Sequence, residues 1–118
     1  MGGLPPWLLW QSSTMRVRTT HPDFVYYVSN WFGVLLTKLK PYLYKNGGPI
    51  IMVQVENEYG SFGCDPDYKT FLRDLMQFHL GDDVVLFTTD NAIESKLKCG
   101  SIPSVYPTVD FGPGRNLH

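Results

Sequence analysis

The chain has 118 residues, 43% of them apolar and 18% charged, with a formal net charge of −1 at pH 7. This supply of apolar residues and low net charge exclude an intrinsically disordered chain. With 10 basic and 11 acidic side chains, the chain has no excess of positive charge that would indicate binding to nucleic acid or to an anionic membrane. The longest apolar run, residues 50–53, is far shorter than the roughly 18 residues of a membrane helix. We therefore expect a soluble globular segment with no nucleic-acid partner and no membrane segment.

The beginning of the chain predicts loop structure that leads into a helix. Residues 2–6 have the composition of a loop, residues 7–10 form an apolar plug behind it, and residues 11–20 are polar and irregular. Thr20 is a candidate helix cap, and Pro22 is tolerated in a first helical turn. We therefore expect a helix to start at Thr20.

Apolar residues continue this helix at spacings of three and four from Phe24 onwards. That spacing indicates one helical face turned towards a core, and Trp31 belongs to this face. Pro41 should kink or end the helix, and residues 46–48 (Asn-Gly-Gly) should close it.

The second half of the chain alternates apolar strands with helices. We expect strands over residues 50–55, 84–88 and 108–111, a helix from Asp65 to Gly81, and a short helix over residues 92–98. Continuously apolar strands that alternate with helices favour a parallel sheet covered by helices.

The length of the chain suits part of such a sheet better than a closed structure. A closed eight-stranded barrel needs about 250 residues, so 118 would supply roughly three of its eight units. An open three-stranded sheet would leave two long hydrophobic edges for other sequence to cover. Residues 115–118 add no closing element, so we expect the chain to be incomplete.

Polar residues gather at the end of the first expected strand. Gln54, Glu56 and Glu58 would share one face if the extended alternation persists to the strand's end. Ligands and catalytic residues occupy the carboxyl ends of parallel strands, and a glutamate there is a candidate general acid. The alternative is a pair of solvated glutamates at a strand end, and the pattern alone does not decide between the two.

The segment Val53–Ser61, Val-Gln-Val-Glu-Asn-Glu-Tyr-Gly-Ser, resembles the acid/base signature of the family 35 glycoside hydrolases, the β-galactosidases of lysosomal type. Further matches cover nearly the whole chain in order. They are Gly2-Gly3-Leu4-Pro5 with Trp7-Leu8-Leu9, Asn46–Pro49, Leu80–Asp83 with Leu86–Asp90, and Thr108–Gly112. These segments are similar to the loop after the third barrel strand and to the fourth, fifth and sixth strands of the family.

The resemblance implies the fold and the activity of the complete protein. The chain would be the central portion, about strands 4–6 with their helices, of a (β/α)₈ TIM barrel, an α/β fold. Residues 1–118 would then be a fragment of a single glycoside hydrolase catalytic domain. The expected activity is that of a retaining β-galactosidase, which removes terminal β-linked galactose from oligosaccharides or glycoconjugates without a cofactor.

The same resemblance implies roles for two residues. Glu58 aligns with the acid/base, which protonates the glycosidic oxygen and then activates water. Asn57 aligns with the asparagine that hydrogen-bonds the sugar's 2-hydroxyl group. No role in catalysis is carried over to Glu56, which we expect to be a supporting carboxylate or one in the barrel interior. Tyr59 is the best aromatic candidate to line the cleft.

The second carboxylate of a retaining mechanism is missing from the matched motifs. It should lie about 5–5.5 Å from the acid/base, and in the family it follows a later strand. Glu94 is not a substitute, whereas Asp90 and Asp110 end strands and are candidates to line the cleft. The alternative to an active enzyme is a truncated, inactive barrel fragment or a weak sugar-binding remnant, and we expect the isolated chain to be inactive.

Cys64 and Cys99 are 35 positions apart, and from the sequence alone they could be free thiols or a pair. The resemblance implies a disulfide between them, which in the chain-entropy model would contribute roughly 3–4 kcal/mol to stability. A disulfide fits a lysosomal, vacuolar or extracellular protein, although no signal peptide is visible after Met1. His21, His79 and His118 show no metal-ligand spacing, so we expect no metal site.

Overall fold

The computed structural model describes residues 3–112. Gly2 and residues 115–118, which include His118, therefore lie outside the described residues. The elements in chain order are α1 (Leu8–Gln11), α2 (Pro22–Leu39), the 3₁₀ turns η1 (Lys40–Tyr42) and η2 (Tyr44–Asn46), β1 (Val53–Gln54), the 3₁₀ turn η3 (Tyr59–Ser61), α3 (Pro66–Leu80), β2 (Leu86–Asn91), α4 (Glu94–Gly100) and β3 (Tyr106–Asp110). Across residues 3–112, no helix has both the length and the apolar character needed to cross a membrane.

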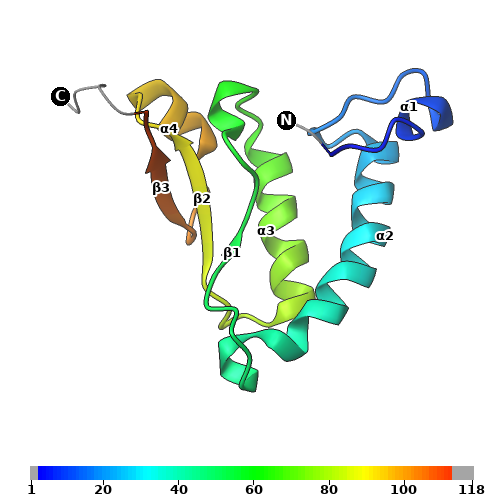
Figure 1. Cartoon of the computed structure of the whole chain (residues 1–118). Helices are drawn as coiled ribbons and strands as arrows, with labels where there is room; N and C mark the ends of the chain where they lie inside the picture. The colour runs from blue at the N-terminus through cyan, green and yellow to red at the C-terminus, as the bar shows by residue number, and fades with distance from the viewer. Residues whose placement is uncertain (1–2, 113–118) are drawn as a thin grey trace.

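The three strands form one parallel sheet in the order β1-β2-β3, which confirms the expected parallel α/β arrangement. Val53 is in register with Leu86, and Asn91 is in register with Asp110. β2 and β3 therefore end together at one edge of the sheet, where η3 and α4 also lie, whereas β1 ends earlier, at Gln54 opposite Phe87 (Figure 1). This edge is where polar residues from different strands can meet.

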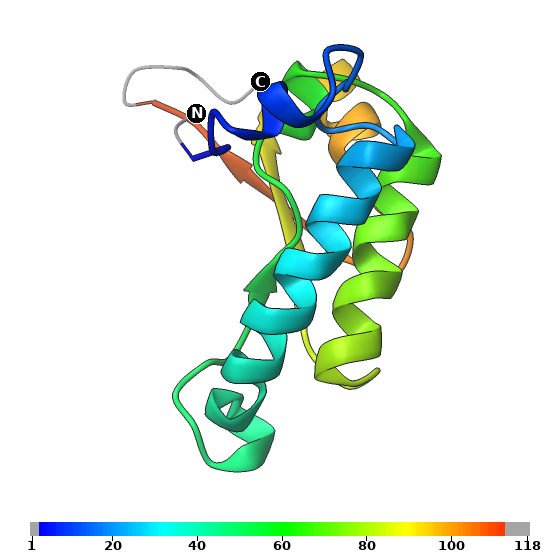
Figure 2. The same ribbon diagram turned by 90° about the vertical axis from the view of Figure 1, so that its right-hand side faces the viewer.

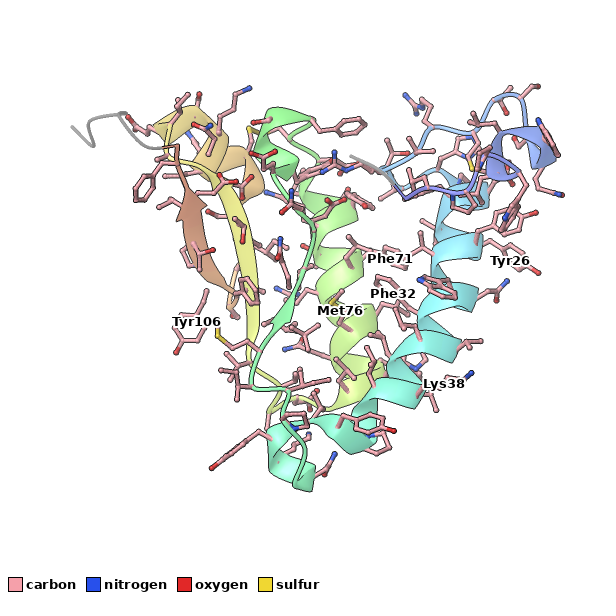
Figure 3. The ribbon with its side chains drawn as sticks, viewed as in Figure 1. Tyr26, Phe32, Lys38, Phe71, Met76 and Tyr106 are labelled. Carbon is pink, nitrogen blue, oxygen red and sulfur yellow. A yellow bond between two sulfur atoms is a disulfide. The ribbon has the colours of Figure 1, made fainter. Side chains whose placement is uncertain are left out.

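The helices α3 and α2 form two further layers beside the sheet (Figures 1 and 2). The side chains of Phe32 on α2 and of Phe71 on α3 lie between the helices, whereas Tyr26 and Lys38 point away from α3 (Figure 3). The buried core spans all three layers and includes Phe24, Leu36, Val55, Leu72, Met76, Leu80 and Leu86. Burial of this shared apolar surface is the main stabilising term.

The long helix begins one residue later than expected. His21 is the cap instead of Thr20, because its Nδ1 accepts a hydrogen bond from the N–H of Asp23 at 3.3 Å, with Pro22 in the first turn. Pro41 ends the α-helix, as expected, and the chain continues as the 3₁₀ turn η1. Gly47 then reverses the chain with φ +87°, a backbone conformation that favours glycine.

Two expectations about the apolar residues near the start were wrong. Trp31 is 59% exposed and does not belong to the core, because the face of α2 that packs against α3 is narrower than the apolar stripe. In the expected plug only Leu8 is buried, and Trp10 is 85% exposed. No described element covers the outer side of α1, so Trp10, and to a lesser extent Trp7 just before the helix, remains in contact with solvent.

Helix α3 follows the expected bounds. Asp65 caps it, since its carboxylate accepts hydrogen bonds from the N–H groups of Asp67 at 3.0 Å and Tyr68 at 3.2 Å. Gly81 ends it with φ +104°, and its N–H donates to the carbonyl of Gln77.

The strands and the short helix are displaced from the predicted ranges. The expected strand over residues 50–55 is reduced to β1, although Val55 still donates from its N–H to Phe87 at 2.8 Å. The strand expected over 84–88 lies at β2 and extends to Asn91, because pairing with β3 outweighs the polar character of its last residues. The short helix expected over 92–98 lies at α4 and the strand expected over 108–111 at β3, each shifted by about two residues.

Cys64 and Cys99 form a disulfide, with their Cα atoms 4.6 Å apart. This is the pairing that the resemblance implied. The bond links the segment between η3 and α3 to the end of α4. It therefore ties the turn that follows β1 to the helix that follows β2.

Candidate active site

The turn after β1 breaks the extended alternation that the sequence suggested. Glu56 and Glu58 have φ angles of +64° and +49°, in the left-handed region that non-glycine residues rarely adopt. The expectation that Gln54, Glu56 and Glu58 share one face was therefore wrong. The two glutamates enter different surroundings.

Glu58 lies at the carboxyl ends of the strands. Its N–H donates to the carbonyl oxygen of Thr89 on β2 at 2.7 Å, which ties the turn to the next strand. A hollow of about 320 Å³ opens here, which we call the strand-end hollow. Its lining residues are Glu58, Asn91, Asp110, Phe111 and Gly112.

The strand-end hollow brings together Glu58 from the turn after β1 and residues at the ends of β2 and β3. Asp110 was a sequence candidate and does line it, and its Oδ1 is buried with no hydrogen-bond partner among residues 3–112. Asn91 was missed by the sequence argument. The sequence did contain a signal for Asn91. Side chains alternate between the two faces of a strand, so Asn91 lies on the face of β2 opposite that of Asp90.

Asp90 does not reach the strand-end hollow, and its candidacy as a cleft residue was wrong. The side chain is 1% exposed, and its Oδ1 accepts a hydrogen bond from the N–H of Gly60 at 2.8 Å. Burial raises the pKa of Asp90, an effect that the Gly60 N–H and the charge of Lys69 oppose. Asp90 therefore joins β2 to η3.

Replacement of Asp90 by Asn should change how stability depends on pH. Burial raises the folded-state pKa of Asp90 above its ordinary value of 3.8. Just above that pH the folded protein therefore binds more protons than the unfolded chain does. As a result, the contribution of Asp90 to stability falls as the pH rises. Asn cannot ionise, so the melting temperature of Asp90→Asn relative to wild type should improve between pH 4 and pH 7. Melting curves of both full-length proteins measure this, and a difference that is constant or falls with pH contradicts it.

Asn57 is exposed beside Glu58 but does not belong to the lining of the strand-end hollow. Its Oδ1 accepts a hydrogen bond from Gln54 Nε2 at 2.9 Å, and the same nitrogen donates to the carbonyl oxygen of Glu56 at 2.8 Å. Gln54 therefore orients the Asn57 amide next to Glu58.

Glu56 points away from the strand-end hollow into an ion pair. Both of its carboxylate oxygens accept hydrogen bonds from Arg18, at 3.0 and 2.7 Å, and Tyr68 donates its hydroxyl to Oε1 at 2.6 Å. Burial, together with the neighbouring carboxylate, raises the pKa of Tyr68 far above its ordinary value, so this hydroxyl remains a donor. With its oxygens engaged in this way, Glu56 is not available as an acid.

Tyr59 is 2% exposed, and the expectation that it lines the cleft was wrong. The turn η3 directs its ring inward, 5.1 Å from the ring centroid of Tyr68. Burial raises the pKa of Tyr59 as well. Within the described range, no group of three or more His, Cys, Asp or Glu side chains is placed to hold a metal ion.

A parallel α/β sheet with a glutamate at the carboxyl ends of its strands has the arrangement that barrel enzymes use for catalysis. The sequence matches the family described as "Glycosyl hydrolases family 35" over residues 1–118, and the chain belongs to this family. Family 35 is a family of TIM-barrel proteins.

The similar proteins include several named β-galactosidases. The chain is 59% identical over 118 residues to the "Beta-galactosidase" of Macaca fascicularis and 58% identical to that of Homo sapiens. It is 50% identical to the "Beta-galactosidase-1-like protein" of Mus musculus. Each match covers 99% of this chain, but the chain spans only 17–18% of the length of these relatives.

Proposed function

We propose that residues 1–118 form the central part, about strands 4–6, of the TIM barrel in the catalytic domain of a retaining β-galactosidase. The substrate of the complete protein would be terminal β-linked galactose on oligosaccharides or glycoconjugates. Membership of family 35 and the similarity to named β-galactosidases support this proposal. The observation that carries it is Glu58, which lines a hollow at the carboxyl ends of the parallel strands β2 and β3.

Glu58 would act as the general acid and then as the general base. In the first step its protonated carboxyl group donates a proton to the leaving glycosidic oxygen. In the second step the carboxylate takes a proton from the water that attacks the galactosyl–enzyme intermediate. The strand-end hollow gives both the glycosidic oxygen and the water access to this carboxyl group.

Asn57 and Asp110 would bind the sugar. Asn57 aligns with the family's contact to the 2-hydroxyl group, a hydrogen bond that strengthens in the transition state. Asp110 lines the strand-end hollow with a buried oxygen that has no donor within residues 3–112. Because an unpaired buried carboxylate oxygen is costly, a sugar hydroxyl group would be a favourable donor for it.

The nucleophile of the reaction would come from another part of the complete protein. Glu56 is held by Arg18 and Tyr68, and Glu94 is exposed in the first turn of α4. Neither residue lines the strand-end hollow with Glu58, where the second carboxylate of a retaining mechanism would be needed. The segment would therefore supply one half of the catalytic pair.

The Cys64–Cys99 disulfide favours a protein made along the secretory route. A lysosomal, vacuolar or extracellular location is consistent with this bond and with the named relatives. We propose no cofactor, because glycoside hydrolysis by two carboxylates requires none.

The full-length protein that carries this segment should hydrolyse an aryl β-galactoside, and proton NMR should detect the β-anomer of galactose as the first product. Residues 1–118 alone should produce no hydrolysis under the same conditions, because they supply only one of the two carboxylates. An α-anomer as the first product contradicts a retaining mechanism. Turnover by the isolated segment contradicts our placement of the nucleophile outside it.

A further inference from the structure

The loop before α2 and the turn after β1 meet in a buried ion pair beside the candidate site. Arg18 is 5% exposed and donates from Nε to Glu56 Oε1 at 3.0 Å and from Nη2 to Oε2 at 2.7 Å. Its guanidinium carbon lies 4.3 Å from the ring centroid of Phe62 and 5.3 Å from that of Tyr59. A bidentate, stacked arrangement of this kind depends on the planar fork of arginine.

This ion pair also holds the backbone on both sides of Asn57. Arg18 Nη2 donates to the Asn57 carbonyl oxygen at 2.9 Å, and Glu56 Oε2 accepts a hydrogen bond from the Asn57 N–H at 2.9 Å. The next N–H, that of Glu58, donates to the carbonyl oxygen of Thr89 at 2.7 Å. The peptide group between Asn57 and Glu58 is therefore fixed at both edges, by Arg18 at its carbonyl and by β2 at its N–H.

The backbone at this ion pair adopts positive φ angles, which are unfavourable for residues other than glycine and need stabilising contacts. Arg18, Glu56 and Glu58 all have positive φ angles, of +56°, +64° and +49°. Conformations of this kind persist where the surrounding contacts over-determine them, and they gather at functional sites. Here the contacts converge on the one peptide that leads into Glu58.

We propose that Arg18 is a positioning residue for the acid/base Glu58, an inference that rests on the proposed function. Arg18 does not line the strand-end hollow and acts through the Asn57–Glu58 peptide group. By holding this peptide, it sets the direction in which the Glu58 carboxyl group meets the glycosidic oxygen. A displacement of about 1 Å at a catalytic group can cost roughly 10²-fold in rate, so this control is significant.

The replacement Arg18→Lys in the full-length protein tests the proposal. Lysine keeps the charge, but its single ammonium group cannot reproduce the fork that holds both Glu56 oxygens and the Asn57 carbonyl. We expect kcat/KM for an alkyl β-galactoside to fall roughly 10- to 100-fold. For 2,4-dinitrophenyl β-galactoside, whose leaving group needs no proton, kcat/KM should fall by less than about 3-fold. A purely structural defect removes active protein and lowers both values by the same factor.

A matched control is available on α3. Arg73 also donates to a carboxylate, that of Asp74 at 2.8 Å, and to a backbone carbonyl, that of Pro103 at 2.9 Å, but it does not contact the turn after β1. Arg73→Lys should therefore leave the ratio of the two kcat/KM values unchanged.

A milder variant covers the case in which Arg18→Lys does not accumulate as folded protein. Tyr68→Phe keeps the aromatic ring but removes the hydroxyl that donates to Glu56 Oε1. It should shift the ratio of the two kcat/KM values in the same direction by a smaller factor. An unchanged ratio in both variants, or in Tyr68→Phe when it alone folds, overturns the role of Arg18 and leaves the proposed function intact. Failure of the unmodified protein to hydrolyse either galactoside overturns both.

Discussion

Glu58→Gln in the full-length protein should lower kcat/KM for an unactivated β-galactoside by about 10²- to 10⁴-fold, the usual contribution of a positioned proton donor. Glutamine has the size of glutamate but carries no acidic proton, so the leaving glycosidic oxygen would depart as an alkoxide. The strand-end hollow would keep its shape, and the protein should remain folded. Steady-state kinetics together with a melting curve measure both parts of this expectation.

The same variant should respond to the leaving group and to added azide. With 2,4-dinitrophenyl β-galactoside the first step needs no acid, so the galactosyl–enzyme intermediate should form and then hydrolyse slowly for lack of a base. Azide attacks without base assistance and should restore turnover, with β-galactosyl azide as the product. This product identifies the missing group as the acid/base.

Glu94→Gln is the matched control, because Glu94 is an exposed glutamate on α4 and should tolerate the same change without loss of activity. Turnover of the unactivated galactoside by Glu58→Gln at the wild-type rate contradicts the assignment of Glu58. Loss of activity in Glu94→Gln to the same degree contradicts it as well, since the effect would then not be specific to the strand-end hollow.

Local sequence signals were sufficient to predict most of the fold. The Asp65 cap, the glycine at position 81 and the apolar runs before Gln54 and Thr88 are short-range features, and each marks an element that the structure contains. Exact strand ends were less predictable, because they depend on pairing between β2 and β3 instead of on the composition of either strand.

The geometry of the site was harder to predict for a similar reason. Motif resemblance selected Glu58, but period-two alternation placed Glu56 beside it, and the positive φ angles of both residues cancel that alternation. Arg18 contacts this turn through the Glu56 carboxylate and the Asn57 carbonyl, and it comes from a stretch that the sequence described only as polar and irregular. A contact across 38 residues leaves no trace in local periodicity.

The close packing of η3 against α4 gives the second large expected effect, a loss of stability on Gly60→Ala. A Cβ atom at Gly60 would lie 1.9 Å from the carbonyl oxygen of Lys96 and 3.0 Å from the backbone nitrogen of Gly100. These are backbone atoms, so no side-chain rotation relieves the overlap and α4 itself must move. The disulfide at Cys99 restrains that movement.

We expect Gly60→Ala to cost about 1–3 kcal/mol or more, the range for overpacking a well-filled interior. The matched control is Gly33→Ala on α2, where the new Cβ would lie 3.8 Å from His79 Cε1, an ordinary contact. Inside a helix this change should stabilise by about 0.5–1 kcal/mol. Melting temperatures of the two full-length variants should therefore move in opposite directions from wild type. Equal stability of the two variants would contradict the packing of η3 on α4. Because Glu58 directly precedes η3, Gly60→Ala should also lower activity.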